Sequence, residues 1–458
     1  MNSQPTDTSP RLLKISNRVA YIGLFTLLAG DAFRYSVGWW GWGALLALLL
    51  GWTTYLFIKG EPRRLLHQVP LPLTLLLGLM ALSTFWSNYS ALTAVATFAQ
   101  LATSLFGLFL AGAYSWRSLL RIFGNTLRFI LATSYLFEFV AAAIVRGPIA
   151  PIFKNYEGDK PPAPAYYWTR GHLFDGDRIQ GIVGNSNLLA YIAMLGLVIF
   201  AIEYMVNDKR RWVYLASLAV VALTLYLAAS AGVAFAILAV VVAAVVALFV
   251  EGRDRDTRHR TYRWAWGVAI VAAALVFSFR KEVFGFIGKT PDMTGRTKIW
   301  KLVFGLIEQR PLQGWGWLSY WVPGVKPYAG LVVLDKVPYY QAHNAFLDVW
   351  LQVGIFGLVL LLWFVTLSFI KLWRLGVRHT NPLYLWPMLI FFGTLAQNLT
   401  ESRMLIESGW AILVLLAVKA NDPSELLEPI EPRARQPKRA RLLALGLRRN
   451  RSQQRKDR

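Results

Sequence analysis

The chain has 458 residues, of which 56% are hydrophobic and 16% charged, and its mean hydropathy is +0.43. This composition excludes an ordinary soluble enzyme and is typical of a polytopic membrane protein. The formal net charge of +23 therefore indicates membrane topology and anionic lipid head groups as partners, not nucleic acid. The absence of cysteine excludes disulfides, zinc–thiolate sites and cysteine nucleophiles.

Apolar runs of about 17–25 residues, enough to cross a bilayer, determine the predicted fold. They predict an all-α polytopic membrane protein with about 12 transmembrane helices. The runs lie near residues 16–33, 39–58, 69–86, 91–113, 118–145, 187–206, 212–229, 231–250, 263–279, 344–370, 383–398 and 403–419. Only Ala229-Ser230-Ala231-Gly232 separates the seventh run from the eighth, where we expect a tight hairpin.

The basic residues of the short connections predict the orientation. Connections near residues 34–38, 87–90, 230 and 399–402 carry only Arg34, whereas the alternate connections are rich in Lys and Arg. The positive-inside rule then places both termini in the cytoplasm. We expect residues 1–15 to be a cytoplasmic tail without a cleavable signal, 16–420 a transmembrane catalytic domain, and 421–458 a basic cytoplasmic tail.

Two long connections, 146–186 and 280–343, fall on the non-cytoplasmic side, and both contain many cations. Long loops are weakly constrained by the charge rule, so chance is one explanation. Binding of a phosphorylated substrate is the other. Within 280–343, the run from Thr297 to Glu308 has apolar residues at helical spacing, which predicts a surface helix able to lie along the membrane.

His343 is the first candidate for chemistry, because it stands where the tenth predicted span begins. The positive end of that helix dipole favours a neutral imidazole, which can accept a proton from a sugar hydroxyl. The alternative is an interfacial histidine that caps the helix together with Asn344. Among the remaining histidines, His172 is the one expected on the same side.

Two arginines are candidate phosphate ligands. Arg296 follows Thr294-Gly295 at the start of the predicted surface helix, where free N–H groups and a guanidinium together suit a phosphate. Arg178 precedes Gly184-Asn185-Ser186-Asn187, a turn that opens the sixth span. The alternatives are a snorkelling role for Arg296 and ordinary helix capping by Asn187.

Residues just upstream of Arg178 allow two interpretations. Arg170 and His172 belong either to the same site or to a solvated loop. Asp175 and Asp177 form an Asp-x-Asp pair, which can hold a divalent cation between diphosphate oxygens. The same two acids can instead be counter-ions of the neighbouring arginines.

Charged residues within or beside the spans are costly and therefore candidates for function. Glu401 begins the last span on the side of His343 and Arg296, so it can orient either one or make a structural pair. Glu203 and Arg403 lie near span ends and can snorkel, and Asp31 and Glu138 are single acids with no visible partner.

Four motifs on the same side of the membrane resemble the pattern of the bacterial O-antigen ligase family. They are an arginine before Gly181-x-x-Gly184-Asn185-x-Asn187, Thr294-Gly295-Arg296, Pro311-x-x-Gly314-x-Gly316, and His343-Asn344. The family shares this set with O-antigen polymerases and protein O-oligosaccharyltransferases. The resemblance covers roughly residues 90–420, and Ser186 stands where the family often has proline.

The resemblance implies transfer of a glycan from undecaprenyl diphosphate to a sugar hydroxyl of lipid A–core, at the periplasmic face of the inner membrane. It implies an inverting reaction with no metal, cofactor or nucleotide sugar. We expect His343, Arg296 and Arg178 to be catalytic. The expected substrate-binding residues are Arg170, His172, Asn185, Asn187, Asn344, Glu401 and Arg403.

Three other functions remain open. An O-antigen polymerase would use a second lipid-linked glycan as acceptor, and a protein oligosaccharyltransferase would use a protein; both share the donor chemistry. A polysaccharide or lipid flippase is the non-enzyme alternative, but it should line its interior with charges along several helices. The candidate polar residues here instead belong to one membrane face.

Overall fold

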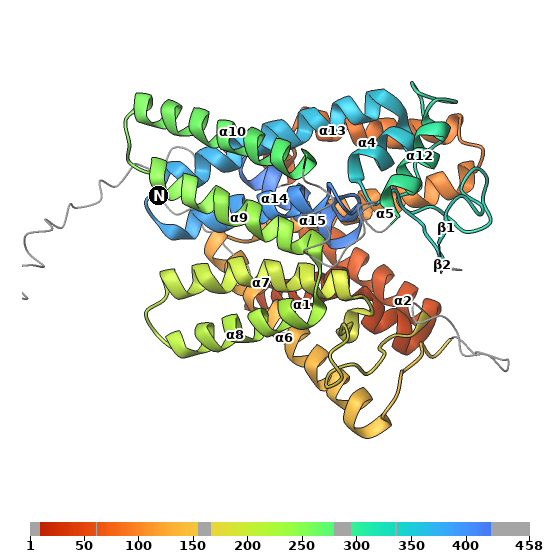
Figure 1. Cartoon of the computed structure of the whole chain (residues 1–458), viewed down its shortest axis with the longest axis horizontal. Helices are drawn as coiled ribbons and strands as arrows, with labels where there is room; N and C mark the ends of the chain where they lie inside the picture. Colours follow the sequence, from red (N-terminus) through yellow and green to blue (C-terminus); the bar gives the residue numbers. More distant parts are fainter. Residues whose placement is uncertain (1–9, 61, 154–165, 279–294, 335–336, 423–458) are drawn as a thin grey trace, which may run out of the picture.

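The fold was obtained as a computed structural model, which describes residues 10–60, 62–153, 166–278, 295–334 and 337–422. The helices run alongside one another in a bundle, and α12 (Arg296–Ile307) lies at one end with strands β1 (Val333–Leu334) and β2 (Val337–Pro338) (Figure 1). Most of both predicted tails, 1–9 and 423–458, and parts of both long connections, 154–165, 279–294 and 335–336, lie outside the described residues.

Helices account for nearly all of the regular structure in the described ranges. In chain order they are α1 (Pro10–Leu28), α2 (Gly30–Lys59), α3 (Pro62–Leu66), α4 (Leu71–Leu82), η1 (Ser83–Phe85), α5 (Ser90–Ala113), α6 (Trp116–Phe139), η2 (Val140–Val145), η4 (Gly181–Val183), α7 (Ser186–Val206), α8 (Arg211–Ala228), α9 (Ala231–Val250), α10 (Arg255–Ser278), α12, α13 (Ala345–Arg378), η5 (Pro382–Tyr384), α14 (Leu385–Gln397), η6 (Arg403–Leu405) and α15 (Glu407–Lys419). The predicted all-α class is confirmed.

A helix occupies each of the twelve predicted apolar ranges, but in the part of the chain that the structure describes seven helices are long and apolar enough to cross a membrane. These are α2, α5, the continuous Trp116–Val145 segment, α7, α8, α9 and α13. The count of about 12 spans therefore stays a prediction. The expected hairpin between the seventh and eighth ranges is confirmed, because α8 ends at Ala228 and Ala229 turns the chain with φ 44°.

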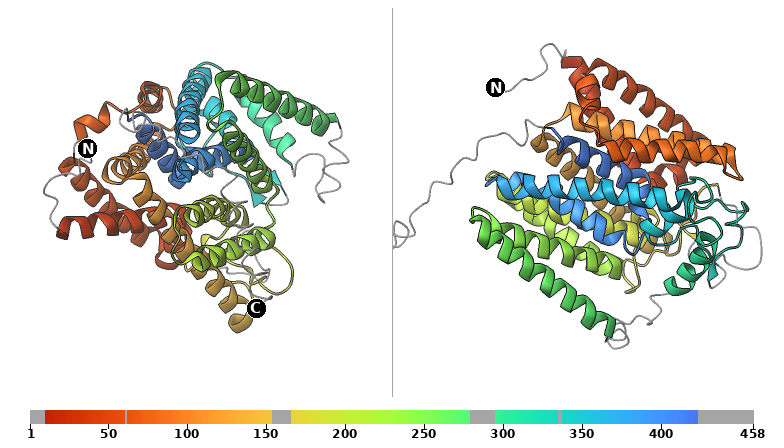
Figure 2. Two further views of the ribbon diagram at one scale, coloured as in Figure 1. Left: turned by 90° about the vertical axis from the view of Figure 1, so that its left-hand side faces the viewer. Right: turned by 90° about the horizontal axis from the view of Figure 1, so that it is seen from above.

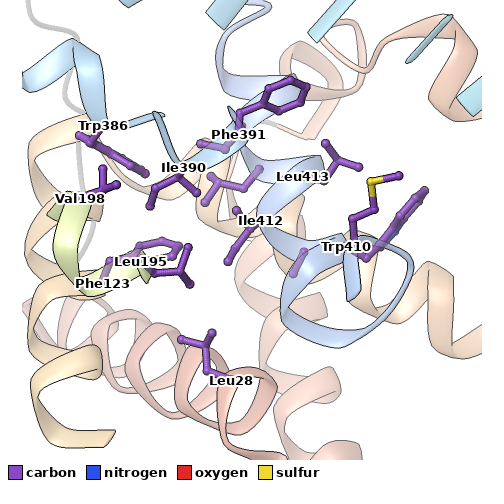
Figure 3. Packing of buried hydrophobic residues seen from close by; sticks show 14 of the residues in the cluster. Leu28, Phe123, Leu195, Val198, Trp386, Ile390, Phe391, Trp410, Ile412 and Leu413 are labelled. Carbon is purple, nitrogen blue, oxygen red and sulfur yellow. The ribbon is translucent and has the colours of Figure 1, made fainter. Parts of the chain in front are cut away.

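The core lies around α7, α14 and α15. The side chains of Leu195 and Val198 on α7 face those of Trp386 and Ile390 on α14 (Figure 3). Every residue of α15 from Ser408 to Lys419 is buried, which places this short helix inside the bundle, as Figure 2 shows from two further sides. Because α15 leads directly from the connection that carries Glu401, the packed core fixes the position of that connection.

Helix α13 is broken at Gly354, and the Pro311–Gly316 turn supplies hydrogen-bond partners for the backbone at the break. Gly354 has φ 71° and ψ −173°, so the helical hydrogen bonds stop there. The N–H groups of Trp315 and Gly316 donate to the carbonyls of Leu351 and Gln352, at 3.1 and 2.8 Å. These bonds satisfy backbone carbonyls that the break would otherwise leave unpaired. The glycines are required because a Cβ on Gly354 would lie 1.9 Å from the carbonyl oxygen of Leu312.

Helix α12 matches the predicted amphipathic run, but protein covers part of its apolar face, while Phe304 stays 40% exposed. Ile299, Val303 and Ile307 are buried in a cluster that includes Trp321 and Leu351. The Ile299, Val303 and Ile307 side chains therefore attach α12 to the loop and to α13.

Three acids that the sequence left without partners, or expected to snorkel, are paired. Asp31 forms an ion pair with Arg34, and Glu203 is buried in an ion pair with Arg128 of α6. Glu138 is fully buried and accepts three hydrogen bonds, as detailed below. The partner of Glu203 lies 75 residues away in the chain, and the partners of Glu138 lie on the loop before α7. Only Asp31 has a partner one helical turn away.

We expect Gly354→Ala to destabilise the protein strongly, because alanine resists φ 71° and its methyl group would collide with Leu312. The cost should exceed about 2 kcal/mol and appear as a lower melting temperature in detergent. The matched control is Gly51→Ala in α2, where a Cβ meets nothing within 4 Å. That change should be neutral or stabilise the helix by up to about 1 kcal/mol. Equal melting temperatures for the two variants would contradict this account of the turn.

Candidate functional site

Four segments that are distant in sequence meet at the end of the bundle where α12 lies (Figure 1). They are the turn before α13, the connection between α14 and α15, the start of α12, and the loop that leads into α7. Each contributes one of the predicted residues: His343, Glu401, Arg296 and Arg178 respectively. The meeting point is therefore a shared site, built from both long connections and the bundle.

Glu401 is the centre of this site. Its Oε2 lies 3.0 Å from Nδ1 of His343 and accepts a hydrogen bond from Nε2 of Gln341 at 3.0 Å. Its Oε1 accepts from a terminal nitrogen of Arg296 at 3.3 Å. The carboxylate is only 4% exposed, so these contacts replace water around its charge.

Asn187 connects Glu401 to the second arginine. Its Nδ2 donates to Oε1 of Glu401 at 3.4 Å, while its Oδ1 accepts from a terminal nitrogen of Arg178 at 2.7 Å. Nε of Arg178 donates to the carbonyl of Ala228 at 2.7 Å, which fixes the guanidinium against the end of α8. The two arginines therefore lie at opposite ends of one Asn187–Glu401 bridge.

The two asparagines before α7 have different roles. Asn185 is the N-cap, because its Oδ1 accepts from the N–H of Leu188 at 3.1 Å. Capping by Asn187, which was the alternative to a functional role, is therefore wrong. Asn344 caps α13 by accepting from the N–H groups of Phe346 and Leu347, and the capping alternative is confirmed for this residue.

The electrostatics of Glu401 follow from its surroundings. Burial by itself raises the pKa of the Glu401 carboxyl, but the charges of His343, Arg403 and Arg296 outweigh burial, and the net shift of the pKa is downward. The carboxylate thus stays ionised at neutral pH. An ionised carboxylate can only accept, so the neutral tautomer of His343 that suits this contact carries its proton on Nδ1 and leaves Nε2 free.

Polar atoms around Glu401 have unused hydrogen-bonding capacity. Among the described residues, the buried Nε atoms of Arg296 and Arg403 and the buried Oε1 of Gln341 have no hydrogen-bond partner. An unpaired buried guanidinium N–H is costly and matches an anionic group, whereas an unpaired amide oxygen matches a hydroxyl. The site can therefore take a ligand that carries both.

Arg170 and His172 gather around Arg178 and make no direct contact with His343 among the interactions of the described residues. Arg170 donates to the carbonyl of Arg178 at 3.3 Å and lies 3.4 Å from Asp177. His172 contacts Asp175 at 2.5 Å, and the hydrogen bond from His172 lowers the pKa of that carboxyl. In the part of the chain that the structure describes, no three His, Cys, Asp or Glu residues are arranged to hold a metal ion.

Glu138 on α6 fixes the backbone of the loop that carries Arg170 and Arg178. It accepts from the N–H groups of Gln180 and Gly181, at 2.8 and 2.6 Å, and from the hydroxyl of Thr169 at 2.8 Å. Arg170 and Arg178 lie next to these anchored positions in the chain.

Sequence reasoning missed Gln341 and Asp348. A glutamine two residues before a histidine carries no signal of its own. Asp348 did carry one, because it is a carboxylate inside the predicted span 344–370, where charge is costly.

Comparisons with known proteins bear on the family of the chain. Fold and site define a multi-pass membrane protein with a polar site at one end of its helices. Residues 222–362 match a family model described as O-antigen ligase, which confirms the resemblance that the motifs indicated. The match contains Arg296 and His343, whereas Arg178, Asn187 and Glu401 lie outside it.

One curated relative is an exopolysaccharide production protein, ExoQ, from Rhizobium meliloti (strain 1021). It is 27% identical over 214 residues, which is 44% of this chain and 48% of the relative. The chain thus spans about half the length of the curated relative that it matches. Together the two findings support a membrane glycosyltransferase of O-antigen ligase or polymerase type.

We expect Glu401→Gln to be less stable than the wild type at pH 7, by on the order of 3 kcal/mol, because Arg296 and His343 lose a buried partner. The lowered pKa of Glu401 also gives a pH dependence. Its contribution is fully present above the pKa of an unfolded glutamate, about 4.3, and is lost as the pH falls through its own lower pKa.

The melting temperature of the wild type should therefore fall more steeply below about pH 4.3 than that of the Glu401→Gln variant. Thermal melts in detergent between pH 7 and pH 3 measure this difference. Glu308→Gln, which removes an exposed carboxylate at the end of α12, is the control and should keep the wild-type profile. Parallel acid curves for wild type and Glu401→Gln would count against the assignment.

Proposed function

We propose that the protein is an O-antigen ligase, which moves O-antigen polysaccharide from undecaprenyl diphosphate to a sugar hydroxyl of lipid A–core. The observation that carries the proposal is the Glu401 constellation: one buried carboxylate contacts a histidine and an arginine directly, and a second arginine through Asn187. A proton acceptor beside two cations suits glycosyl transfer from a diphosphate.

The arginines act on the leaving group. As the bond between the anomeric carbon and the diphosphate oxygen breaks, negative charge grows on the diphosphate, and Arg296 and Arg178 stabilise that charge. The unpaired Nε of Arg296 gives this side chain a second donor for a phosphate oxygen while a terminal nitrogen contacts Glu401. Arginines thus supply the charge that a divalent cation supplies in many glycosyltransferases.

His343 acts on the acceptor. Its Nε2 takes the proton of the acceptor hydroxyl as the oxygen attacks the anomeric carbon, and undecaprenyl diphosphate leaves from the opposite side, with inversion. Glu401 holds Nδ1–H and stabilises the imidazolium that forms. The free Oε1 of Gln341 offers an acceptor for a sugar hydroxyl at the same place.

Both substrates are lipids, which explains a site at the end of the membrane helices. The charge pattern of the short connections supports a periplasmic site in the inner membrane, with both termini in the cytoplasm. In this assignment Arg170, His172, Asn185, Asn344 and Arg403 support or extend the binding surface around the three catalytic residues.

An O-antigen-type polymerase is the second candidate, favoured by the similarity to an exopolysaccharide production protein. It would use the same donor chemistry, with a second lipid-linked glycan in place of lipid A–core. A protein oligosaccharyltransferase would differ in the same way. A flippase is disfavoured, because the contacts around Glu401 gather the candidate polar residues at one end of the bundle.

Reconstitution tests the acceptor. Purified protein in liposomes receives undecaprenyl-diphosphate glycan together with lipid A–core and a second lipid-linked glycan as competing acceptors. We expect transfer to lipid A–core, and transfer that persists in EDTA. Transfer to the lipid-linked glycan alone would establish the polymerase instead, and loss of transfer in EDTA would return the Asp175–Asp177 pair as a metal site.

His343→Ala should lower transfer by at least about 10²-fold, since the base is removed. The protein should remain folded, because Glu401 keeps its contacts with Arg296 and Gln341 when the ring is removed. His67→Ala, at an exposed histidine of the short connection before α4, is the control and should be fully active. Unimpaired transfer by His343→Ala would refute the assignment of the base.

Arg296→Lys should also lower transfer by about 10²-fold or more, because an ammonium cannot make the paired contacts that a guanidinium makes to phosphate. Removal of an exposed cation from the same helix, Lys298→Ala, provides the comparison and should leave transfer near the wild-type rate. If both variants lose transfer equally, the effect is general charge and Arg296 has no specific role.

A further inference from the structure

Asp348 lies in the first turn of α13 and is fully buried. Its Oδ1 accepts from Nε1 of Trp321 at 2.9 Å. Its Oδ2 accepts from the N–H of Ala342 at 2.9 Å and from the hydroxyl of Ser402. One carboxylate thus receives three hydrogen bonds from three segments: the long loop, the turn before α13 and the connection before α15.

Two of these donors are chain neighbours of the reacting groups. Ala342 directly precedes His343, and Ser402 directly follows Glu401. Oδ2 of Asp348 therefore positions the backbone of Ala342, next to His343, and the side chain of Ser402, next to Glu401. His343 and Glu401 are 58 residues apart in the sequence, so their 3.0 Å contact requires the two segments to be held together.

The backbone at His343 needs such support. This residue has φ 52°, a left-handed conformation that costs a side chain other than glycine about 1–2 kcal/mol. The turn is held on both sides: the carbonyl of Ala342 accepts from Nε1 of Trp300 at 3.0 Å, and the N–H of Ala345 donates to the carbonyl of Asn398 at 3.1 Å. Trp300 belongs to α12, the helix that starts with Arg296, so the same turn also links the base to this arginine.

We propose that Asp348 is a positioning residue, which keeps His343 and Glu401 in register by binding Ala342 and Ser402 with one carboxylate oxygen. This inference rests on the proposed glycosyl transfer and names the group that preorganises its base. Asp348 itself does not touch the substrate.

An asparagine cannot replace this carboxylate. All three partners are donors, and both carboxylate oxygens accept, whereas an amide presents one oxygen and one NH₂ group. In Asp348→Asn the NH₂ group faces either the Nε1–H of Trp321 or the Ala342 and Ser402 donors. Because the backbone N–H of Trp321 binds the carbonyl of Tyr340 at 2.9 Å, a segment attached to His343 or Glu401 must shift in either orientation. A displacement of about 1 Å at a reacting group costs about 10²-fold in rate.

The test is steady-state transfer by the full-length Asp348→Asn protein in liposomes. We expect kcat to fall by about 10²-fold, while KM for the lipid-linked donor stays within about threefold, because Arg178 and Arg296 are untouched. The matched control is Glu203→Gln, which removes another buried carboxylate at the far end of α7, about 24 Å along the helix from Asn187. This control should lower the melting temperature without changing kcat.

A double-mutant cycle separates positioning from general damage. If Asp348 acts through the His343–Glu401 pair, adding Asp348→Asn to Glu401→Gln should cost less than about threefold further, because the register no longer matters. A full additional 10²-fold loss in that background would overturn the proposal, as would an unchanged kcat for Asp348→Asn alone.

Two results keep the test decisive. If Asp348→Asn does not fold, Ser402→Ala removes one donor and leaves Asp348 with two partners; an unchanged kcat for this variant would overturn the proposal, and a fall of about tenfold would support it. Failure of the wild type to transfer glycan under any condition would instead refute the proposed function, which distinguishes the two.

Discussion

A buried carboxylate surrounded by cationic and polar donors holds the site together. Glu401 cannot lie at 4% exposure without partners, because burial of an uncompensated charge costs several kcal/mol. Its partners come from the turn before α13, from α12 and from α7, so satisfying one charge brings three distant segments to one point. Arg178 joins through Asn187, and the two long connections become parts of the same structure.

The bundle provides the rigidity for this arrangement. Helix α15 is buried from Ser408 to Lys419, so the connection that precedes it has little freedom. On the other side, the break in α13 at Gly354 binds the Pro311–Gly316 turn, and the α12 cluster fills the space between them. Rigid helices thus position a site made almost entirely of loop and helix-terminal residues.

The sequence predicted the helical class, the apolar ranges and the membership of Arg178, Arg296, His343 and Glu401 in one region. These predictions rested on periodicity, charge asymmetry and motif order, which are local or additive signals. The pairings were beyond reach: Glu203 with Arg128, Glu138 with the 180–181 backbone, and Asp348 with Ala342 join residues by tertiary packing. The count of spans also stayed open, because α14 and α15 are shorter than the apolar runs that contain them.

The close approach at Gly354 has a consequence for exchanging parts between related proteins. The turn and the helix break fit each other through two glycines, since a Cβ on Gly314 would lie 2.5 Å from the backbone of Gln352 and one on Gly354 would meet Leu312. Neither the turn nor the helix break can therefore change its backbone conformation without a change in the other. A hybrid that takes its loop from one parent and α13 from another will join two backbones that were never fitted, so the smallest transferable unit runs from before Pro311 to beyond Gly354. That unit contains His343 and Asp348, so a hybrid that exchanges this loop will carry the proposed base and its proposed positioning residue along.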